Sequence, residues 1–203
     1  MLKIKTNDIS QLRELTTLNT HKNIEEQFEN IARQLLSKYL IRIKECCYKI
    51  NEIEFYYYSK THPDPYVHRH ENQLKKACWY FHKKEGTFKG LDITFGNGFC
   101  YGGILIRSLE TLYNSYCVPG PSKVVDEILV LHGCKKVKEL LNSKIALSLD
   151  VIKENTPVEE IYKGKRVGLN LKKEDSDGYF INKKYRFCMN IINIKKDKRG
   201  LSK

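Results

Sequence analysis

One short stretch alternates apolar with acidic and aromatic residues: Ile50-Asn51-Glu52-Ile53-Glu54-Phe55-Tyr56. Successive side chains of a β-strand point to opposite faces, so Glu52, Glu54 and Tyr56 would share one face. Two carboxylates and an aromatic ring on one surface suit a site in which one glutamate is a general base and Tyr56 stacks on a flat substrate. The alternative is an exposed sheet face whose acidic residues are offset by lysines. The stretch predicts a strand and leaves the role of its polar face open.

The residues before this stretch predict a helix and then strands. Asn23, with Glu26 three residues later, resembles a helix cap, and apolar residues then recur at helical spacing to about Ser37. From Tyr39 the period changes to two, which predicts one strand there and a second over about 48–58. The sequence therefore predicts that a helix packs beside the first strands.

The residues after this stretch predict a strand-rich domain with helices on its flank. Residues 59–84, which hold Pro63 and Pro65, predict an irregular loop, and Gly96-Asn97-Gly98 predicts a hairpin turn. The remaining pattern predicts strands over 87–95, 103–109, 145–149, 166–171 and 179–190, a helix begun by 119–122, a short helix around 135–141 and one helical turn opened by Thr156, Pro157 and Glu159. We expect an α+β fold, a single domain with a mixed or antiparallel core.

Composition favours an intracellular protein. The chain has 203 residues, enough for one domain with a real core, and no apolar run approaches the roughly 18 residues of a membrane span. Residues 1–7 have no apolar stretch suited to a signal peptide. The seven cysteines are odd in number and include no Cys-x-x-Cys pair, which favours free thiols over a disulfide or zinc framework. We expect a soluble protein of the nucleus, or of a bacterial or viral nucleoid or cytoplasm.

The formal net charge of +12 indicates an anionic partner, with DNA or RNA favoured over a membrane surface. Part of this charge lies in 195–203, a basic tail that we expect to be disordered, which leaves 1–194 as the folded domain. The alternative is a generically basic surface that binds nothing, since lysine-rich composition can follow genome bias.

Two further segments are candidates for chemistry. The run from His62 to His70 contains His, Asp and a His-x-His pair, which are possible metal ligands, although loop histidines are more often plain polar residues. Phe95, beside the glycines of the predicted turn, could enter a nucleic-acid duplex as a wedge or could belong to the core. Arg107 closes an apolar strand, where a cation requires a carboxylate or a phosphate. Phosphate-loop, dinucleotide-binding and nucleophile-elbow motifs are absent.

Taken in order, segments through most of the chain resemble motifs of the alkyladenine (3-methyladenine) DNA glycosylase family. The matching segments are Ala32–Leu40 ("A-x-x-L-L-G-x-x-L"), Ile53–Tyr56 ("T-E-A-Y"), Pro63–His68 ("P-E-D…H"), Gly86-Thr87 with Phe95-Gly96 ("G-T…Y-G"), Ile104–Glu110 ("V-L-I-R-A-L-E"), Gly120–Ser122 ("G-P-G/S"), Ile145–Leu147 ("G-x-D-L…L"), Arg166–Leu169 ("R-I-G-I") and Tyr185–Phe187 ("W-R-F"). Each motif alone is weak, but their shared order is specific.

The resemblance implies a fold and a reaction. The fold would be the glycosylase-like one, akin to the barrel of a formyltransferase C-terminal domain. The protein would bend damaged double-stranded DNA and flip an alkylated or deaminated purine into a pocket. Glu54 would activate water against the sugar carbon, and Arg107 with the backbone carbonyl near Val167 would hold that water. The protein would be a hydrolase, a monofunctional DNA N-glycosylase that acts as a monomer without a metal, a cofactor or a Schiff-base lysine.

The resemblance also assigns the binding residues. Tyr56 would stack on the flipped base, His68 would face it from the other side, and Phe95 would be the intercalating wedge. One departure concerns Asp92, which stands where the family has a second stacking aromatic residue. A carboxylate there would meet the base with hydrogen bonds and charge, which favours a cationic base or one that offers donors. The segment 97–102 also looks shortened, and 75–85 matches no family motif.

Two other classes of protein remain open. A nucleic-acid-binding module without catalysis would keep the fold and the basic face, and Asp92 with the shortened hairpin favours it. A metal-dependent hydrolase would use His62, Asp64, His68 and His70.

Overall fold

A long antiparallel sheet carries the fold. The structure is a computed structural model that describes residues 9–19, 22–84, 87–113, 116–142, 147–151, 160–191, 194 and 200–203. Its strands are β1 (Tyr39–Ile43), β2 (Cys46–Ser59), β3 (His62–Pro63), β4 (Lys76–Lys84), β5 (Thr87–Phe95), β6 (Tyr101–Thr111), β7 (Cys117–Pro119), β8 (Leu147–Val151), β9 (Tyr162–Gly164) and β10 (Arg186–Cys188). The helices are α1 (Leu12–Leu15), α2 (Ile24–Lys38), α3 (Pro121–His132) and α4 (Val137–Leu141), with 3-10 turns η1 (Glu71–Leu74) and η2 (Lys173–Asp175).

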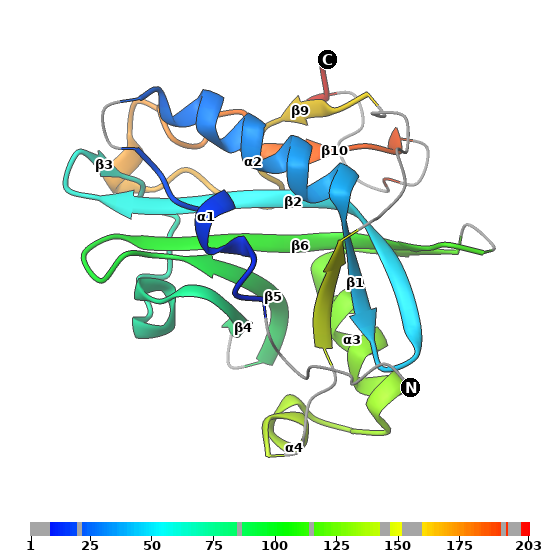
Figure 1. The fold of residues 1–203 in the computed structure, drawn as a ribbon. Helices are drawn as coiled ribbons and strands as arrows, with labels where there is room; N and C mark the ends of the chain where they lie inside the picture. The colour runs from blue at the N-terminus through cyan, green and yellow to red at the C-terminus, as the bar shows by residue number, and fades with distance from the viewer. Residues whose placement is uncertain are drawn as a thin grey trace.

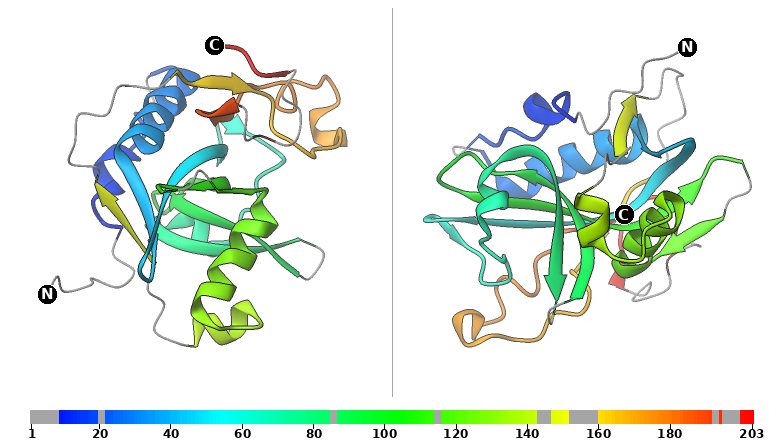
Figure 2. Two further views of the ribbon diagram at one scale, coloured as in Figure 1. Left: turned by 90° about the vertical axis from the view of Figure 1, so that its right-hand side faces the viewer. Right: turned by 90° about the horizontal axis from the view of Figure 1, so that it is seen from below.

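The strands curl into one sheet, whose main path runs β4-β5-β6-β2-β1-β8. β2 is the axis of the sheet, because it pairs with β6 along one edge and with β1, β10 and β3 in turn along the other. Every pairing between these strands is antiparallel. In Figure 1, α2 lies along β2 and β10, while α3 and α4 lie at the other end of the molecule, and Figure 2 shows the curl of the sheet from the side. The structure is thus a single strand-rich α+β domain, as predicted.

A β-bulge at Asn51 sets which side chains of β2 face the core. The register against β6 shifts on both sides of Glu52, and Asn51 instead exchanges hydrogen bonds with Met189 and Asn190. One extra residue reverses the alternation of a strand. Ile50 and Ile53 are therefore both buried in the core, although they are an odd number of residues apart.

An aromatic cluster fixes α2 on the sheet. The Phe28 ring stacks on Phe55 at 4.4 Å and meets Phe95 and Tyr185 edge to face. Aromatic pairs of this kind add to the free energy gained by burying their area. Asn23 caps the helix by accepting hydrogen bonds from the backbone N–H groups of Glu25 and Glu26. The predicted helix, its cap and its packing face are confirmed.

Most of the predicted elements are present, and the errors fall in the segments 59–84 and 166–190. The strands predicted over 39–43, 48–58, 87–95 and 103–109, the hairpin turn and the helices near 121 and 137 are confirmed. The loop predicted over 59–84 is wrong in part, since this segment contains β3, η1 and β4. The strand predicted over 166–171 is wrong, because these residues form a loop, and only Arg186–Cys188 of 179–190 is a strand.

Two predicted segments lie partly or wholly outside the described residues. Residues 145–146 of the strand predicted over 145–149 lie outside them, while 147–149 belong to β8, and the whole helical turn at Thr156, Pro157 and Glu159 lies outside them. Within the predicted tail, 195–199 also lie outside them, but Ser202 exchanges two backbone hydrogen bonds with Lys163 beside β9. The expectation of a disordered tail is therefore wrong for residues 200–203.

Candidate functional site

A cavity of about 870 Å³ opens beside the middle of β2 and β6. Its walls come from β2, β4, β5 and β6, from the segment before η1, from the start of α3, and from the loop 167–172. A space of this size is within the range of small-molecule sites and would hold a nucleobase with its sugar. The polar residues on its walls include Glu52, Tyr56, His68, Gln73, His82, Asp92, Arg107 and Arg186.

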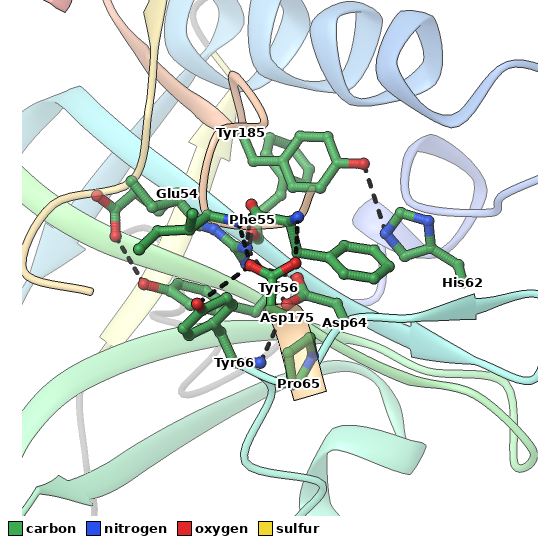
Figure 3. Close-up of polar contacts among 12 residues, drawn as sticks. Glu54, Phe55, Tyr56, His62, Asp64, Pro65, Tyr66, Asp175 and Tyr185 are labelled. Carbon is green, nitrogen blue, oxygen red and sulfur yellow. Dashed lines mark hydrogen bonds and ion pairs between the residues drawn. The ribbon is translucent and has the colours of Figure 1, made fainter. Parts of the chain in front are cut away.

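Glu54 is fully buried and held by donors on both carboxylate oxygens. Its Oε1 accepts a 2.7 Å hydrogen bond from the backbone N–H of Val167 and lies 3.2 Å from Nη1 of Arg107. Its Oε2 accepts a 2.8 Å hydrogen bond from the Tyr56 hydroxyl, which Figure 3 shows as the dashed line between the two side chains. Three lining residues of the cavity thus meet at one carboxylate.

Glu52 and two arginines complete this wall. Oε1 of Glu52 accepts hydrogen bonds from Nε of Arg107 at 2.9 Å and from Nε of Arg186 at 2.6 Å. The two adjacent carboxylates raise the pKa of Arg107, although burial opposes that shift. We call Glu52, Glu54, Arg107 and Arg186 the carboxylate wall. The alternative of an exposed acidic face offset by lysines is wrong, because this face is buried and its counter-ions are arginines.

Tyr56 links the carboxylate wall to the cavity. Burial and then the charge of Glu54 raise the pKa of Tyr56 well above its ordinary value, so the hydroxyl stays a hydrogen-bond donor. The guanidinium of Arg166 lies 4.8 Å from the ring centre and covers one face of the ring. Since Tyr56 also lines the cavity, the rest of its ring surface is what a bound molecule would meet.

A second polar pair, His82 and Asp92, lies on the wall formed by β4 and β5. Nδ1 of His82 is 3.1 Å from Oδ1 of Asp92, and both side chains are largely buried. Gly90 makes room for the imidazole, since a Cβ atom at Gly90 would lie 2.1 Å from Cε1 of His82. Gly103 likewise makes room beside Asp92, because a Cβ there would lie 3.0 Å from Oδ2 of Asp92. We call His82 and Asp92 the dyad.

The rim of the cavity is basic. Lys89, Lys123 and Lys172 line it, and Lys123 stands in the first turn of α3. Gly120, whose φ is 100°, and Pro121 begin this helix, so its N-terminal N–H groups lie at the same rim. A helix N-terminus and lysines both favour anions. The rim is therefore suited to anionic groups.

A separate buried network fixes the loop that closes the cavity. Arg166 forms a two-pronged ion pair with Asp64, at 2.6 and 3.3 Å, and donates to the carbonyl of Phe180. Asp175 accepts from the backbone N–H groups of Phe180 and Ile181 and from the Tyr66 hydroxyl. Figure 3 shows these contacts around Asp64, Tyr66 and Asp175. We call Asp64, Tyr66, Arg166 and Asp175 the Arg166 anchor.

Four of the residues assigned by resemblance meet at this cavity, and a fifth is bonded to them. Tyr56, His68, Asp92 and Arg107 line it, and Glu54 contacts two of these four side chains. The His68 ring meets His82 edge to face at 5.0 Å. Val167 is also adjacent to Glu54, but through its backbone N–H and not through its carbonyl.

Phe95 is placed differently from its predicted role. Its side chain is 3% exposed and packs against Phe28, Phe55 and Tyr57, so it belongs to the core and cannot enter a duplex as a wedge. The reason is strand alternation, which turns Phe95 to the face opposite Asp92. Phe99, which lies in the turn between β5 and β6, is instead 91% exposed.

The candidate metal ligands are dispersed. Asp64 pairs with Arg166, His62 packs against Tyr57 and Tyr185, and His70 caps η1 and stacks on Tyr80. Among the described residues no group of three or more His, Cys, Asp or Glu side chains is arranged to hold a metal. This arrangement does not support the metal-dependent interpretation. All seven cysteines are free thiols.

Sequence reasoning missed His82, Arg186 and the basic rim. His82 lies in the segment predicted as a loop, so its place opposite Gly90 in a strand pair could not be expected. A glycine inside a strand signals a close approach of another group, and Gly90 was the available clue. Arg186 had no local signal, because only the pairing of β10 with β2 brings it to Glu52.

The protein is thus a curled antiparallel α+β domain with a polar cavity whose rim carries lysines. No family model matches the chain. The chain is 31% identical over 206 residues to "Uncharacterized protein L759" of Acanthamoeba polyphaga mimivirus, an alignment that covers 87% of this chain and 92% of the viral protein. The chain therefore belongs to the same family as this mimivirus protein. Within the described residues, no helix is both long and apolar enough to cross a bilayer.

Proposed function

We propose that this protein is a monofunctional DNA base-excision glycosylase of the alkyladenine glycosylase type. It would flip a damaged purine, alkylated or deaminated, out of double-stranded DNA into the cavity and hydrolyse its N-glycosidic bond. The observation that carries the proposal is Glu54, a fully buried carboxylate held by Val167, Tyr56 and Arg107 directly beside a cavity of nucleoside size. A buried carboxylate held by several donors beside a cavity is a candidate for a catalytic group.

The proposed reaction uses water as the nucleophile. Glu54 accepts a proton from the water as its oxygen attacks the sugar carbon, and the bond to the purine breaks with its electron pair on the base. Arg107 supports the reaction by fixing the Glu54 carboxylate, which Glu52 assists by orienting the Nε side of the same guanidinium. Since no lysine forms a covalent bond to the sugar, the DNA strand is not nicked.

The walls would hold the base from several sides. Tyr56 offers ring surface for stacking, His68 approaches from the segment before η1, and Asp92 borders the same space. Base–aromatic stacking is worth about 1–3 kcal/mol. The rim lysines and the start of α3 would bind the flanking phosphates, which fits the net charge of +12. Such a protein would act as a monomer wherever a cell or virus keeps its DNA.

Phe99 is the better candidate for the wedge. Its side chain is 91% exposed in the β5–β6 turn, and the turn is fixed by Asn97, whose side chain accepts from the backbone N–H groups of Phe99 and Cys100. The turn also joins the cavity region, because Gly98 donates to the carbonyl of Leu74, next to the lining residue Gln73. An exposed aromatic side chain on a fixed turn is suited to fill the gap that a flipped base leaves.

Glu54→Gln with Glu52→Gln as its matched control tests the proposal. Both changes remove one buried carboxylate charge that contacts Arg107, but only Glu54 contacts Val167 and Tyr56. We expect Glu54→Gln to lower single-turnover base release by about 10³-fold or more while leaving duplex binding within a few-fold. We expect Glu52→Gln to lower release by only about 10-fold, because Glu52 touches Arg107 and Arg186 but not Glu54.

The measurement is release of hypoxanthine and 3-methyladenine from duplex oligonucleotides, per folded molecule. If Glu54→Gln released these bases at the wild-type rate, Glu54 would not be the base. A wild-type protein that binds duplexes in a strongly salt-dependent way but forms no abasic site on any lesion would contradict the enzymatic proposal.

That last outcome would support a nucleic-acid-binding module without catalysis. One observation favours this second function: both oxygens of Glu54 already accept hydrogen bonds from the protein. In that case the carboxylate wall stabilises the fold around a cavity that binds a base, and Glu54→Gln would change the unfolding free energy rather than a rate.

A further inference from the structure

Gln73 and Asp92 place two polar atoms next to each other on the cavity wall. Gly103 precedes the lining residue Leu105 by two positions on β6, so both residues face the same side of the strand. A Cβ atom at Gly103 would lie 2.9 Å from Nε2 of Gln73 and 3.0 Å from Oδ2 of Asp92. The glycine therefore leaves room for an amide and a carboxylate against one backbone position, and both of these residues line the cavity.

The hydrogen bonds around these two side chains define one atom as a donor and the other as an acceptor. Oε1 of Gln73 accepts from the backbone N–H of His70 in the capping box of η1, which leaves the Nε2 amino group as the free donor. Oδ1 of Asp92 is bonded to His82 in the dyad, which leaves Oδ2 as the free acceptor. The wall thus presents a donor beside an acceptor.

Both atoms are open to the cavity. In the described ranges of the chain, neither Nε2 of Gln73 nor Oδ2 of Asp92 has a hydrogen-bond partner in the protein. The unpaired polar side-chain atoms that are sealed from solvent in those ranges are Oγ of Ser108 and Nε of Arg166. Because Gln73 and Asp92 are only 2% and 3% exposed and line the cavity, the solvent that reaches their free atoms is that of the cavity. Buried polar groups of this kind are normally satisfied, so a ligand that pairs with both would be favoured.

The two classes of purine offer different groups to such a pair. A guanine-type base presents the O6 acceptor next to two donors, N1–H and the 2-amino group, so Gln73 could donate to O6 while the Asp92 carboxylate accepts from both donors. An adenine-type base has one donor, its 6-amino group, between ring nitrogens that accept, so it could give the carboxylate only one hydrogen bond. A site that recognises its ligand by hydrogen bonds rejects an analogue that leaves polar groups of the site unpaired.

We propose that Gln73 and Asp92 recognise the edge of the bound base and select a guanine-type base over an adenine-type one. The proposal rests on the glycosylase function proposed above and deepens it, because it names the class of base that the cavity accepts, guanine derivatives such as 7-methylguanine. Stacking on Tyr56 tolerates any base, since every base has a flat face. The pair against Gly103 supplies the discrimination that stacking lacks.

Equilibrium binding of mononucleotides tests this recognition without requiring catalysis. Affinities for the deoxynucleoside monophosphates of guanine, hypoxanthine and adenine are measured by isothermal titration for wild type, Asp92→Asn, Gln73→Met and His82→Gln. The three nucleotides share one sugar and one phosphate, so the ratio of their affinities reports on the base alone. Wild type should bind the guanine nucleotide about 10-fold or more tighter than the adenine nucleotide, with the hypoxanthine nucleotide, which lacks the 2-amino group, between them.

The variants separate the two atoms of the pair from their surroundings. Asp92→Asn replaces a carboxylate that only accepts by an amide and should lower the guanine-to-adenine ratio about 10-fold. Gln73→Met removes the donor at nearly equal side-chain length and should lower the ratio by about 3-fold or more. His82→Gln is the matched control, because glutamine can still donate to Oδ1 of Asp92, and it should leave the ratio within about 2-fold of wild type.

Release of methylated bases from duplexes separates this proposal from the glycosylase proposal. Relative to the spontaneous rates, wild type should accelerate release of 7-methylguanine about 10-fold more than release of 3-methyladenine, and Asp92→Asn should lose this preference. A wild-type nucleotide ratio near one, or a ratio that Asp92→Asn and Gln73→Met both leave unchanged, overturns the recognition by this pair, whether or not bases are released. Nucleotide selectivity that these two variants abolish, in a protein that releases no base, supports the recognition and overturns the glycosylase function alone.

Discussion

Arg107 and Arg166 are both buried arginines that pair with carboxylates from the segment 52–64, yet only Arg107 lines the cavity. Arg166 is enclosed by Asp64 and by the carbonyls of Phe55 and Phe180, and its guanidinium also lies over the rings of Tyr56 and Tyr66. Arg107 meets Glu52 and Glu54 at the edge of an open space. The Arg166 anchor thus links segments of the chain to one another. Glu52, Arg107 and Arg186 of the carboxylate wall instead line a cavity that another molecule can enter.

This difference separates residues that build the site from residues that would work in it. The Arg166 anchor connects the segment at Asp64 with the loop 166–181 and supports Tyr56 by packing on one face of its ring. Substitutions in the Arg166 anchor should therefore lower the free energy of unfolding. Under the proposed function, substitutions in the carboxylate wall should lower the rate of base release. Three predictions examine this separation, beginning with the largest expected effect.

Asp64→Asn should be the most damaging single change to the fold. It leaves the Arg166 guanidinium buried without its counter-ion, which typically costs about 3–5 kcal/mol. Urea unfolding of wild type and variant measures the difference in the free energy of unfolding. The control is Asp177→Asn, an exposed carboxylate in the same loop, which should change it by less than about 0.5 kcal/mol. A loss below about 1 kcal/mol in Asp64→Asn would show that the anchor does not stabilise the domain.

Phe95→Ala should change the stability of the fold, whereas Phe99→Ala should change the binding of DNA. Phe95 is buried among aromatic rings, so its removal should lower the free energy of unfolding by about 3 kcal/mol or more. Phe99 is 91% exposed, so its removal should change stability by less than about 0.5 kcal/mol. If Phe99 is the wedge, Phe99→Ala should instead weaken binding to a lesion-bearing duplex about 10-fold, measured by fluorescence anisotropy. Unchanged duplex binding would remove Phe99 from the proposed interface.

His62 should give the smallest effect, a loss of stability in acid. Burial lowers the pKa of His62 to about 4, with nearby Asp64 opposing and Arg166 adding to the shift. In the unfolded chain a histidine titrates near 6.5, so between these values the unfolded state binds more protons and stability falls as pH falls. Because part of the ring is exposed, we expect roughly 1–2 kcal/mol between pH 7 and 4.5.

The control for this prediction is the variant His62→Gln, which does not titrate. Urea unfolding at the two pH values should show a smaller acid loss in His62→Gln than in wild type, by the same roughly 1–2 kcal/mol. An equal acid loss in both proteins would assign the effect to other groups.

The sequence determined the elements that depend on local pattern. The Asn23 cap and the apolar spacing after it specify α2, because a helix end needs partners for its free N–H groups and its buried face repeats every three to four residues. The alternation around Glu54 specifies β2 and places Glu52, Glu54 and Tyr56 on one face, because side chains of a strand alternate. The same alternation in β5 already separated Asp92 from Phe95, which is why only Asp92 reaches the cavity.

The tertiary structure alone decided what those elements bring together. The loop 166–171 resembled a strand by its residues, yet Gly168 has a φ of 75° and the Asp64–Arg166 pair holds the segment as a loop over the cavity. Val167 and Arg107, which contact Glu54, come from segments far from it in the chain, and Asp92 reaches His82 across a strand pair. Local pattern carries no information on such contacts, because their free energy depends on burial and charge in the assembled fold.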